Sequence, residues 1–80
     1  MSVKLVFLGK LADLAGAPEK DVPGPLDWRG LLDALPGPLG AATRGDKVKL
    51  AGGGTVLADK TALAASDGDE VALLPPVSGG

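Results

Sequence analysis

The sequence predicts one domain of the α+β class, in which a small mixed sheet packs on one main helix. Three observations predict this fold. Apolar and polar side chains alternate over residues 47–51, as in a strand with one buried face. Residues 28–35 carry apolar side chains at positions i, i+3, i+4 and i+7, the spacing of an amphipathic helix. A short apolar segment over residues 70–74 comes just before a Pro-Pro sequence, and 80 residues leave room for only one small core.

The N-terminal part is expected to form a strand and a short helix. A strand over residues 3–8 turns its odd-numbered side chains to the core. Val6 and Leu8 on its opposite face leave two alternatives, a strand covered on both sides or a docking patch. Residues 9–16 have leucines three positions apart and a closing glycine, which predicts a short helix.

The main helix follows a segment rich in glycine and proline. Residues 19–22 are the only strand candidate in that segment. Asp27 can cap the helix over residues 28–35, because its side chain can accept hydrogen bonds from the free backbone N–H groups of the first turn. Trp28 is expected to anchor the core, and Pro36 is expected to end the helix.

The second half is expected to supply the remaining strands. A loose turn of helix over residues 39–45 precedes the strand at residues 47–51. The glycines at 52–54 indicate a hairpin rather than a phosphate-binding loop, because no Lys-Ser/Thr pair follows them. After a connection with Leu63 inserted in the core, the segment 70–74, which is continuously apolar after Glu70, is expected to be central and covered on both faces.

This order of elements suggests a ubiquitin-like β-grasp fold. It divides the chain into a β-grasp domain over residues 1–74 and a flexible C-terminal carrier tail over residues 75–80. Prolines fix φ near −65° and favour an extended residue before them, so the tail leaves the domain stiffly. Fully extended, six residues reach about 20 Å, far enough to enter another protein's active site.

Two glycines end this tail, and they can thread a channel too narrow for other residues. A closing Gly-Gly is by itself also typical of a frayed terminus or a cloning scar. An apolar strand that runs directly into Pro-Pro-Val favours a functional tail. The predicted site is therefore the carboxylate of Gly80, and the predicted partner-binding residues of the tail are Pro75, Pro76, Val77, Ser78 and Gly79.

The composition contains neither cysteine nor histidine, which excludes thiol nucleophiles, the usual zinc sites and the commonest general base. If the chain handles sulfur, the sulfur must be carried by the terminus. A carboxylate is inert at neutral pH, but a partner can convert it to an acyl adenylate, which a sulfur donor or an amine can attack. We expect no cofactor or metal on this chain and no catalytic side chain; the activating partner would use ATP.

Charge and hydropathy bear on location and partners. The net charge of −2 makes nucleic acid an unexpected partner. No apolar run approaches the roughly 20 residues of a membrane span and no signal peptide precedes residue 3, so a cytoplasmic location without a membrane partner is expected. The last twenty residues carry only acidic charges, at Asp67, Asp69 and Glu70. They indicate either a partner with a basic entrance or simply a solvated turn.

The last fourteen residues, DGDEVALLPPVSGG, resemble the C-terminus of the small subunit of molybdopterin synthase, a ubiquitin-like sulfur carrier. Residues 3–16 are similar to the opening strand and short helix of that family, and residues 28–35 to its main helix. The overall length also agrees. The resemblance thus covers nearly the whole chain, and its motif is most specific at the C-terminus.

The resemblance implies a sulfur carrier for molybdenum cofactor biosynthesis. An adenylating, ubiquitin-activating-like enzyme would activate Gly80, and a sulfur donor protein would convert it to a thiocarboxylate. The large synthase subunit would then receive the tail, in a heterotetramer, and transfer the sulfur to cyclic pyranopterin monophosphate. The family's docking surface corresponds here to Leu8, Val56 and Leu74, beside the tail.

Other functions share the same features. A sulfur carrier for thiamine, tRNA or cysteine synthesis would have the same fold and Gly-Gly end, generally without the Pro-Pro-Val context. A ubiquitin-like modifier would use the same adenylate but finish in an isopeptide bond to lysine. A pure interaction domain would not need its terminal glycines.

Overall fold

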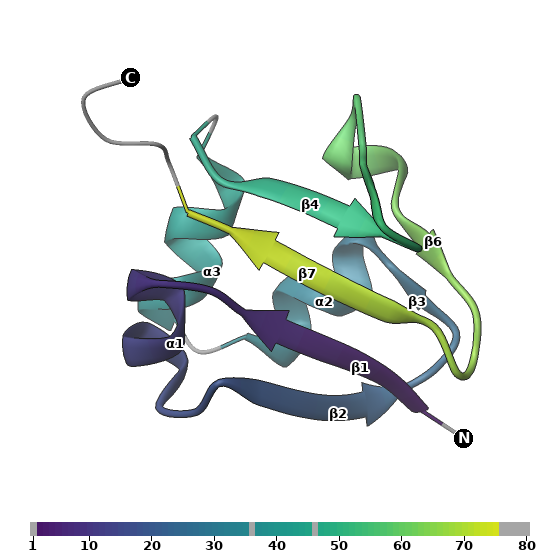
Figure 1. Ribbon diagram of the computed structural model, residues 1–80, viewed down its shortest axis with the longest axis horizontal. Coiled ribbons are helices and arrows are strands. Elements are labelled where there is room, and N and C mark those ends of the chain that lie inside the picture. Colours follow the sequence, from purple (N-terminus) through teal and green to yellow (C-terminus); the bar gives the residue numbers. More distant parts are fainter. Residues whose placement is uncertain (1, 36, 46, 76–80) are drawn as a thin grey trace.

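A computed structural model describes residues 2–35, 37–45 and 47–75, and it confirms the α+β fold with a β-grasp topology (Figure 1). In this part of the chain the main sheet has five strands, in the spatial order β2 (Glu19–Pro23), β1 (Ser2–Phe7), β7 (Glu70–Leu74), β4 (Lys49–Gly52) and β5 (Thr55–Val56). Its helices are α1 (Lys10–Ala15), α2 (Trp28–Ala34) and α3 (Gly37–Arg44), followed later by the 3-10 helix η1 (Lys60–Ala62).

The last strand lies in the middle of the sheet. β7 runs parallel to β1, with Lys4 opposite Glu70 and Phe7 opposite Leu73, and antiparallel to β4. The expected central position is therefore confirmed. Because β7 is hydrogen-bonded on both sides, the residues after Leu74 are attached to one of the best-supported elements of the domain.

The local signals for α1 and α2 act as predicted. Gly16 ends α1 in the left-handed conformation, with φ 78°, and its N–H donates to the carbonyl of Ala12. Asp27 caps α2, and its side chain accepts a hydrogen bond of 2.7 Å from the N–H of Gly30. α2 ends at Ala34, while Pro36 lies outside the described residues.

The segment expected to be a loose turn of helix is a full helix, α3. Gly37, Pro38 and Gly40 give it weak helix propensity. Packing compensates, because Leu39, Gly40 and Thr43 are buried, and the Thr43 hydroxyl donates a hydrogen bond of 2.8 Å to the carbonyl of Leu39. The connection after β5 also holds an unexpected short strand, β6 (Ala64–Ala65), paired antiparallel with β3 (Leu26–Asp27).

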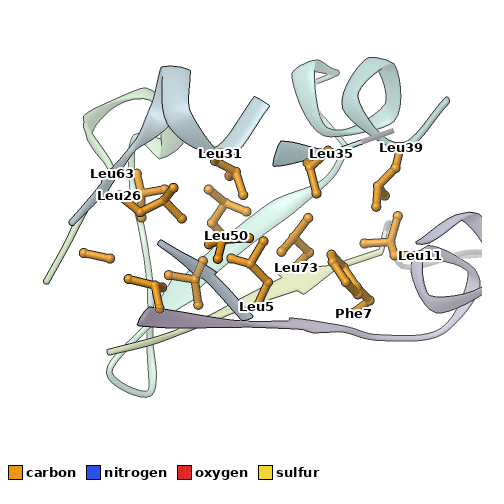
Figure 2. Close-up of a cluster of buried hydrophobic side chains, with 14 of the residues drawn as sticks. Leu5, Phe7, Leu11, Leu26, Leu31, Leu35, Leu39, Leu50, Leu63 and Leu73 are labelled. Carbon is orange, nitrogen blue, oxygen red and sulfur yellow. The ribbon is translucent and has the colours of Figure 1, made fainter. Parts of the chain in front are cut away.

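The core lies between the sheet and the helices (Figure 2). Leu5, Leu50 and Leu73 point up from the sheet, and Leu31 and Leu39 point down from the helices. Leu63 is buried as expected, but Trp28 is only partly buried and packs against the side of the core. None of the helices in the described ranges is long and apolar enough to cross a lipid bilayer.

Within residues 2–35, 37–45 and 47–75 the sheet is covered on one face only, so the expectation that β7 is covered on both faces is wrong. Along β7, Val71 and Leu73 are buried, whereas Ala72 and Leu74 are partly exposed. The helices lie behind the sheet in Figure 1, and the opposite face carries the partly exposed residues. We call this second side the open face.

We expect Leu73→Ala to lower the free energy of unfolding by about 2–5 kcal/mol, because it removes a fully buried side chain from the central strand and leaves a cavity. Urea denaturation followed by the fluorescence of Trp28 measures this change. The control is Leu14→Ala, the same substitution at a side chain that is 44% exposed, with an expected loss below about 1 kcal/mol. Equal losses in the two variants would contradict the assignment of Leu73 to the core.

Candidate functional site

The tail begins where β7 ends, and we call the surrounding residues Leu8, Gly9, Leu74 and Pro75 the tail root. Leu74 is opposite Lys49 on β4, and the N–H of Leu8 donates a hydrogen bond of 3.3 Å to the carbonyl of Leu73. The structure thus places the predicted residues Leu8 and Leu74 beside each other and next to Pro75. The other predicted tail residues, Pro76, Val77, Ser78, Gly79 and Gly80, lie outside the described residues.

The open face continues from the tail root across the sheet. The strand registers form one row across β1, β7, β4 and β5, made by Val6, Ala72, Ala51 and Val56. Val56 at the far end is 53% exposed, and Leu8 at the tail root is 41% exposed. The apolar surface therefore links all three predicted docking positions, Leu8, Val56 and Leu74.

For the second face of the first strand, the sequence leaves two alternatives, a covered surface or a docking patch. The structure favours the patch, because Val6 is only half-buried and no helix of the described residues lies over this face of β1. Ala51 and Ala72 were not predicted as part of it. Their small side chains carry no signal of their own, and only the strand register places them between Val6 and Val56.

Gly9 sets the geometry of the tail root. Its φ of 56° and ψ of −131° form a combination that only glycine adopts at low cost. A Cβ atom at this position would also lie 3.2 Å from Cγ of Pro75, closer than ordinary contact. The glycine lets the turn after β1 approach the first residue of the tail, which fixes where the tail leaves the domain.

Gly9→Ala is expected to reduce the free energy of unfolding by about 1–3 kcal/mol, through backbone strain and the contact with Pro75. Thermal and urea denaturation measure the loss. Gly37→Ala is the matched control, because a Cβ there meets no atom within 4 Å and the position is helical. A Gly9→Ala variant as stable as this control would show that the turn is not strained.

The charges around the tail root are basic rather than acidic. Asp67 and Asp69 lie in the turn that precedes β7, at the opposite end of the strand from the tail (Figure 1). Both residues are exposed, and Asp69 accepts a hydrogen bond of 2.8 Å from the N–H of Ser66, which agrees with the solvated turn of the two alternatives. The charged residues beside the tail root are lysines: Lys49 lies opposite Leu74 in the strand register, and Lys10 directly follows Gly9 in the sequence.

Away from the tail root, the polar contacts support the loops. The hydroxyl and the N–H of Thr61 donate hydrogen bonds to Asp59, which lower the pKa of its carboxyl below the usual value. The side-chain amino group of Lys60 donates hydrogen bonds to the carbonyls of Gly45 and Val48, and its Nζ atom lies 5.9 Å from the centre of the Trp28 ring. Within residues 2–35, 37–45 and 47–75, no cluster of three carboxylate side chains is arranged to hold a metal ion.

Comparison with protein-family models gives a match over residues 5–80 to the ThiS family. The chain belongs to this family. The match spans both the β-grasp domain and the residues of the predicted tail. A comparison with curated protein sequences returned no match.

Solved structures similar to this ThiS-family chain include two archaeal modifier proteins. The crystal structure of SAMP1 from Haloferax volcanii is 28% identical, with a TM-score of 0.70 and full coverage of both chains. The solution structure of the small archaeal modifier protein 1 from Methanosarcina acetivorans is 26% identical with a TM-score of 0.75, over 99% of this chain and 96% of that one.

A third similar structure is the complex of subunits 1 and 2 of the molybdopterin-converting factor from Helicobacter pylori. It is 23% identical, with a TM-score of 0.63 and full coverage of both chains, a likeness that shows the fold. Family and fold together support a ubiquitin-like sulfur carrier or modifier for this ThiS-family chain.

Proposed function

We propose that this chain is the sulfur carrier of molybdopterin synthase, and that Gly80 is the group that carries the sulfur. An adenylating enzyme joins the Gly80 carboxylate to AMP and releases pyrophosphate from ATP. A sulfide-level sulfur atom delivered by a sulfur donor protein then attacks the acyl carbon, and the new C–S bond replaces the C–O bond to AMP, which leaves as the thiocarboxylate forms. The large synthase subunit takes up the tail and transfers the sulfur to cyclic pyranopterin monophosphate, and the carboxylate is restored by water.

The observation that carries this proposal is the position of β7. A strand bonded on both sides leads directly into Pro75, so the tail starts from a fixed point and in a fixed direction. The prolines reduce the entropy that the tail loses when it enters a partner. The conversion of the carboxylate needs no side chain of this protein, which agrees with a chain that has no cysteine or histidine.

The open face supports the large subunit as the partner. It presents Leu8 and Leu74 in the tail root and Val56 on the edge strand β5, without a covering element from the described part of the chain. The similar Helicobacter pylori protein is, by its title, in complex with a subunit 2. We therefore expect the open face and the tail to bind the large subunit together, in a heterotetramer located in the cytoplasm.

A protein modifier is the second candidate, because the similar archaeal structures at 26% and 28% identity are modifier proteins by name. A modifier would transfer the acyl group of the same adenylate to the amino group of a lysine and release AMP. The two functions therefore share the activating enzyme and differ in the product.

The intact mass of the protein, isolated from its own cells without a C-terminal tag, tests the proposal. The expected result is a species heavier by the difference between one sulfur and one oxygen atom. Incubation with the large subunit and the pterin precursor should remove it. Unmodified protein alone would contradict the carrier role, and lysine-linked conjugates without a thiocarboxylate would favour the modifier.

A further inference from the structure

A groove lies on the helix side of the tail root, away from the open face. It has a volume of about 480 Å³ and runs between α1 and α3, which pack against each other (Figure 1). Its apolar lining comes from Leu11, Leu14, Ala41, Ala42, Val48 and Pro75. Lys10 and Lys47 complete it, and both are exposed.

Leu14 is the residue that the fold does not explain. Among the described residues, the large apolar side chains that are markedly exposed are Leu8, Leu14 and Val56. Leu8 and Val56 belong to the open face. Leu14 is 44% exposed in the groove instead, next to the buried Leu11. A single exposed leucine needs no partner, but Leu14 continues the apolar lining of the groove, and a contiguous apolar surface of this kind favours a partner that covers it.

The groove is already formed in the free domain. Lys60 donates hydrogen bonds to the carbonyls of Gly45 and Val48, at 2.8 Å for Val48, and so holds the segment between α3 and β4. Leu11 is part of the core, which fixes α1 on the other side. A preformed site costs a partner little ordering entropy.

The charges of the groove select the kind of partner. Lys10 and Lys47 make no ion pair with any residue within 2–35, 37–45 and 47–75, and Asp13 on α1 does not line the groove. Two amino groups beside an apolar floor are complementary to carboxylates beside an apolar side chain. Pro75 is part of the lining, so a protein bound here touches the first residue of the tail.

We propose that this groove binds an acidic segment with an apolar anchor side chain on the adenylating enzyme. The inference rests on the proposed function. The activating enzyme must draw the tail into its active site to reach Gly80, so the surfaces beside the tail root are the part of the domain that comes nearest to the enzyme. The root is flanked by the open face on one side and by the groove on the other, so an enzyme that surrounds it covers both.

Charge reversal in the groove tests this inference. With the purified adenylating enzyme and ATP, the rate of pyrophosphate exchange gives KM and kcat for the carrier. Lys10→Glu combined with Lys47→Glu is expected to raise KM roughly tenfold at low salt, with kcat unchanged, and the difference should shrink as salt is added. Leu14→Asn is expected to raise KM roughly threefold, independently of salt, because it removes apolar contact area.

The control is Arg29→Glu, which makes the same charge change as each single lysine substitution but lies on α2 outside the groove. Its KM should stay within about twofold of wild type. Circular dichroism of each variant confirms that the domain is folded, as expected for exposed positions.

The outcomes separate this inference from the proposed function. Wild-type protein that is never adenylated overturns both. If wild type is adenylated but the Lys10/Lys47 variant has an unchanged KM, the docking site alone is overturned. An equal rise in KM for Arg29→Glu also overturns the docking site, because it would show general charge steering. Sedimentation equilibrium gives the last outcome: a dimer that the double variant abolishes would place a second copy of this chain in the groove and overturn the inference.

Discussion

Deletion of Gly80 is expected to abolish adenylation and thiocarboxylate formation while the free energy of unfolding stays unchanged. The deletion moves the terminal carboxylate back by about 3.5 Å. A displacement of about 1 Å can already cost a hundredfold in rate, so a full residue removes measurable turnover. The domain should be unaffected, because the strand that holds the tail ends at Leu74. Pyrophosphate exchange with the adenylating enzyme and the intact mass measure the loss.

Addition of one glycine after Gly80 is the matched control, since it moves the carboxylate by the same distance in the other direction. We expect the same loss of adenylation. Calorimetry of both variants with the large subunit should still detect binding, because the open face is intact. A deletion variant that is still adenylated would contradict the role of Gly80, and a function that survives in both variants would favour a pure interaction domain.

Val56→Asp is expected to weaken binding of the large subunit by at least about 2 kcal/mol, or roughly thirtyfold. The substitution places a charge on the most exposed large apolar side chain of the open face, at 53% exposure. The carboxylate would have to lose its water in the interface without a compensating partner. Stability should change little, since β5 is a two-residue edge strand. Isothermal titration calorimetry measures the affinity.

Thr55→Asp provides the control for this prediction. Thr55 is the other residue of β5, is also exposed, and turns its side chain to the opposite side of the strand. Its affinity should stay within about threefold of wild type. Equal weakening by both substitutions would show that charge on β5, rather than contact through the open face, determines binding.

The fold could be predicted where one local signal decided each element. The Asp27 cap and the glycine at position 16 fix helix ends through backbone hydrogen bonds between near neighbours. Alternation gave the strands at residues 2–7 and 49–52 to within a few positions. Glycines 53, 54 and 68 all have positive φ, at the turns where the sequence indicated them.

The prediction from sequence was wrong where contacts between distant segments determine the structure. α3 contains glycines and a proline, residues that are typical of loops, and the burial of Leu39 and Thr43 stabilises it as a helix. β3 and β6 pair through two residues each, and a strand of two residues is too short to show an alternating pattern in the sequence. β7 is apolar after Glu70, which predicted burial on both faces, yet Ala72 and Leu74 are partly exposed on a face that no helix of the described residues covers.

The candidate site was predictable only in part, because its residues are brought together by strand pairing and helix packing. The docking positions Leu8, Val56 and Leu74 came from a resemblance, and the strand registers join them into one surface. The lysines near the tail root were not foreseen, because Lys10, Lys47 and Lys49 are scattered along the sequence. The acidic residues are neighbours of the tail only along the chain. The groove depends on the packing of α1 against α3, which no local pattern reports.

The pairing of residue 4 with residue 70 also has a consequence for protein synthesis. The first strand remains without one of its two neighbours until the last strand has left the ribosome, so the domain cannot close around a growing chain. A product that stops before Glu70 lacks the middle of the sheet, and with it the surface that partners would recognise. Interrupted translation is therefore expected to yield unfolded chains rather than folded domains that lack only their tail.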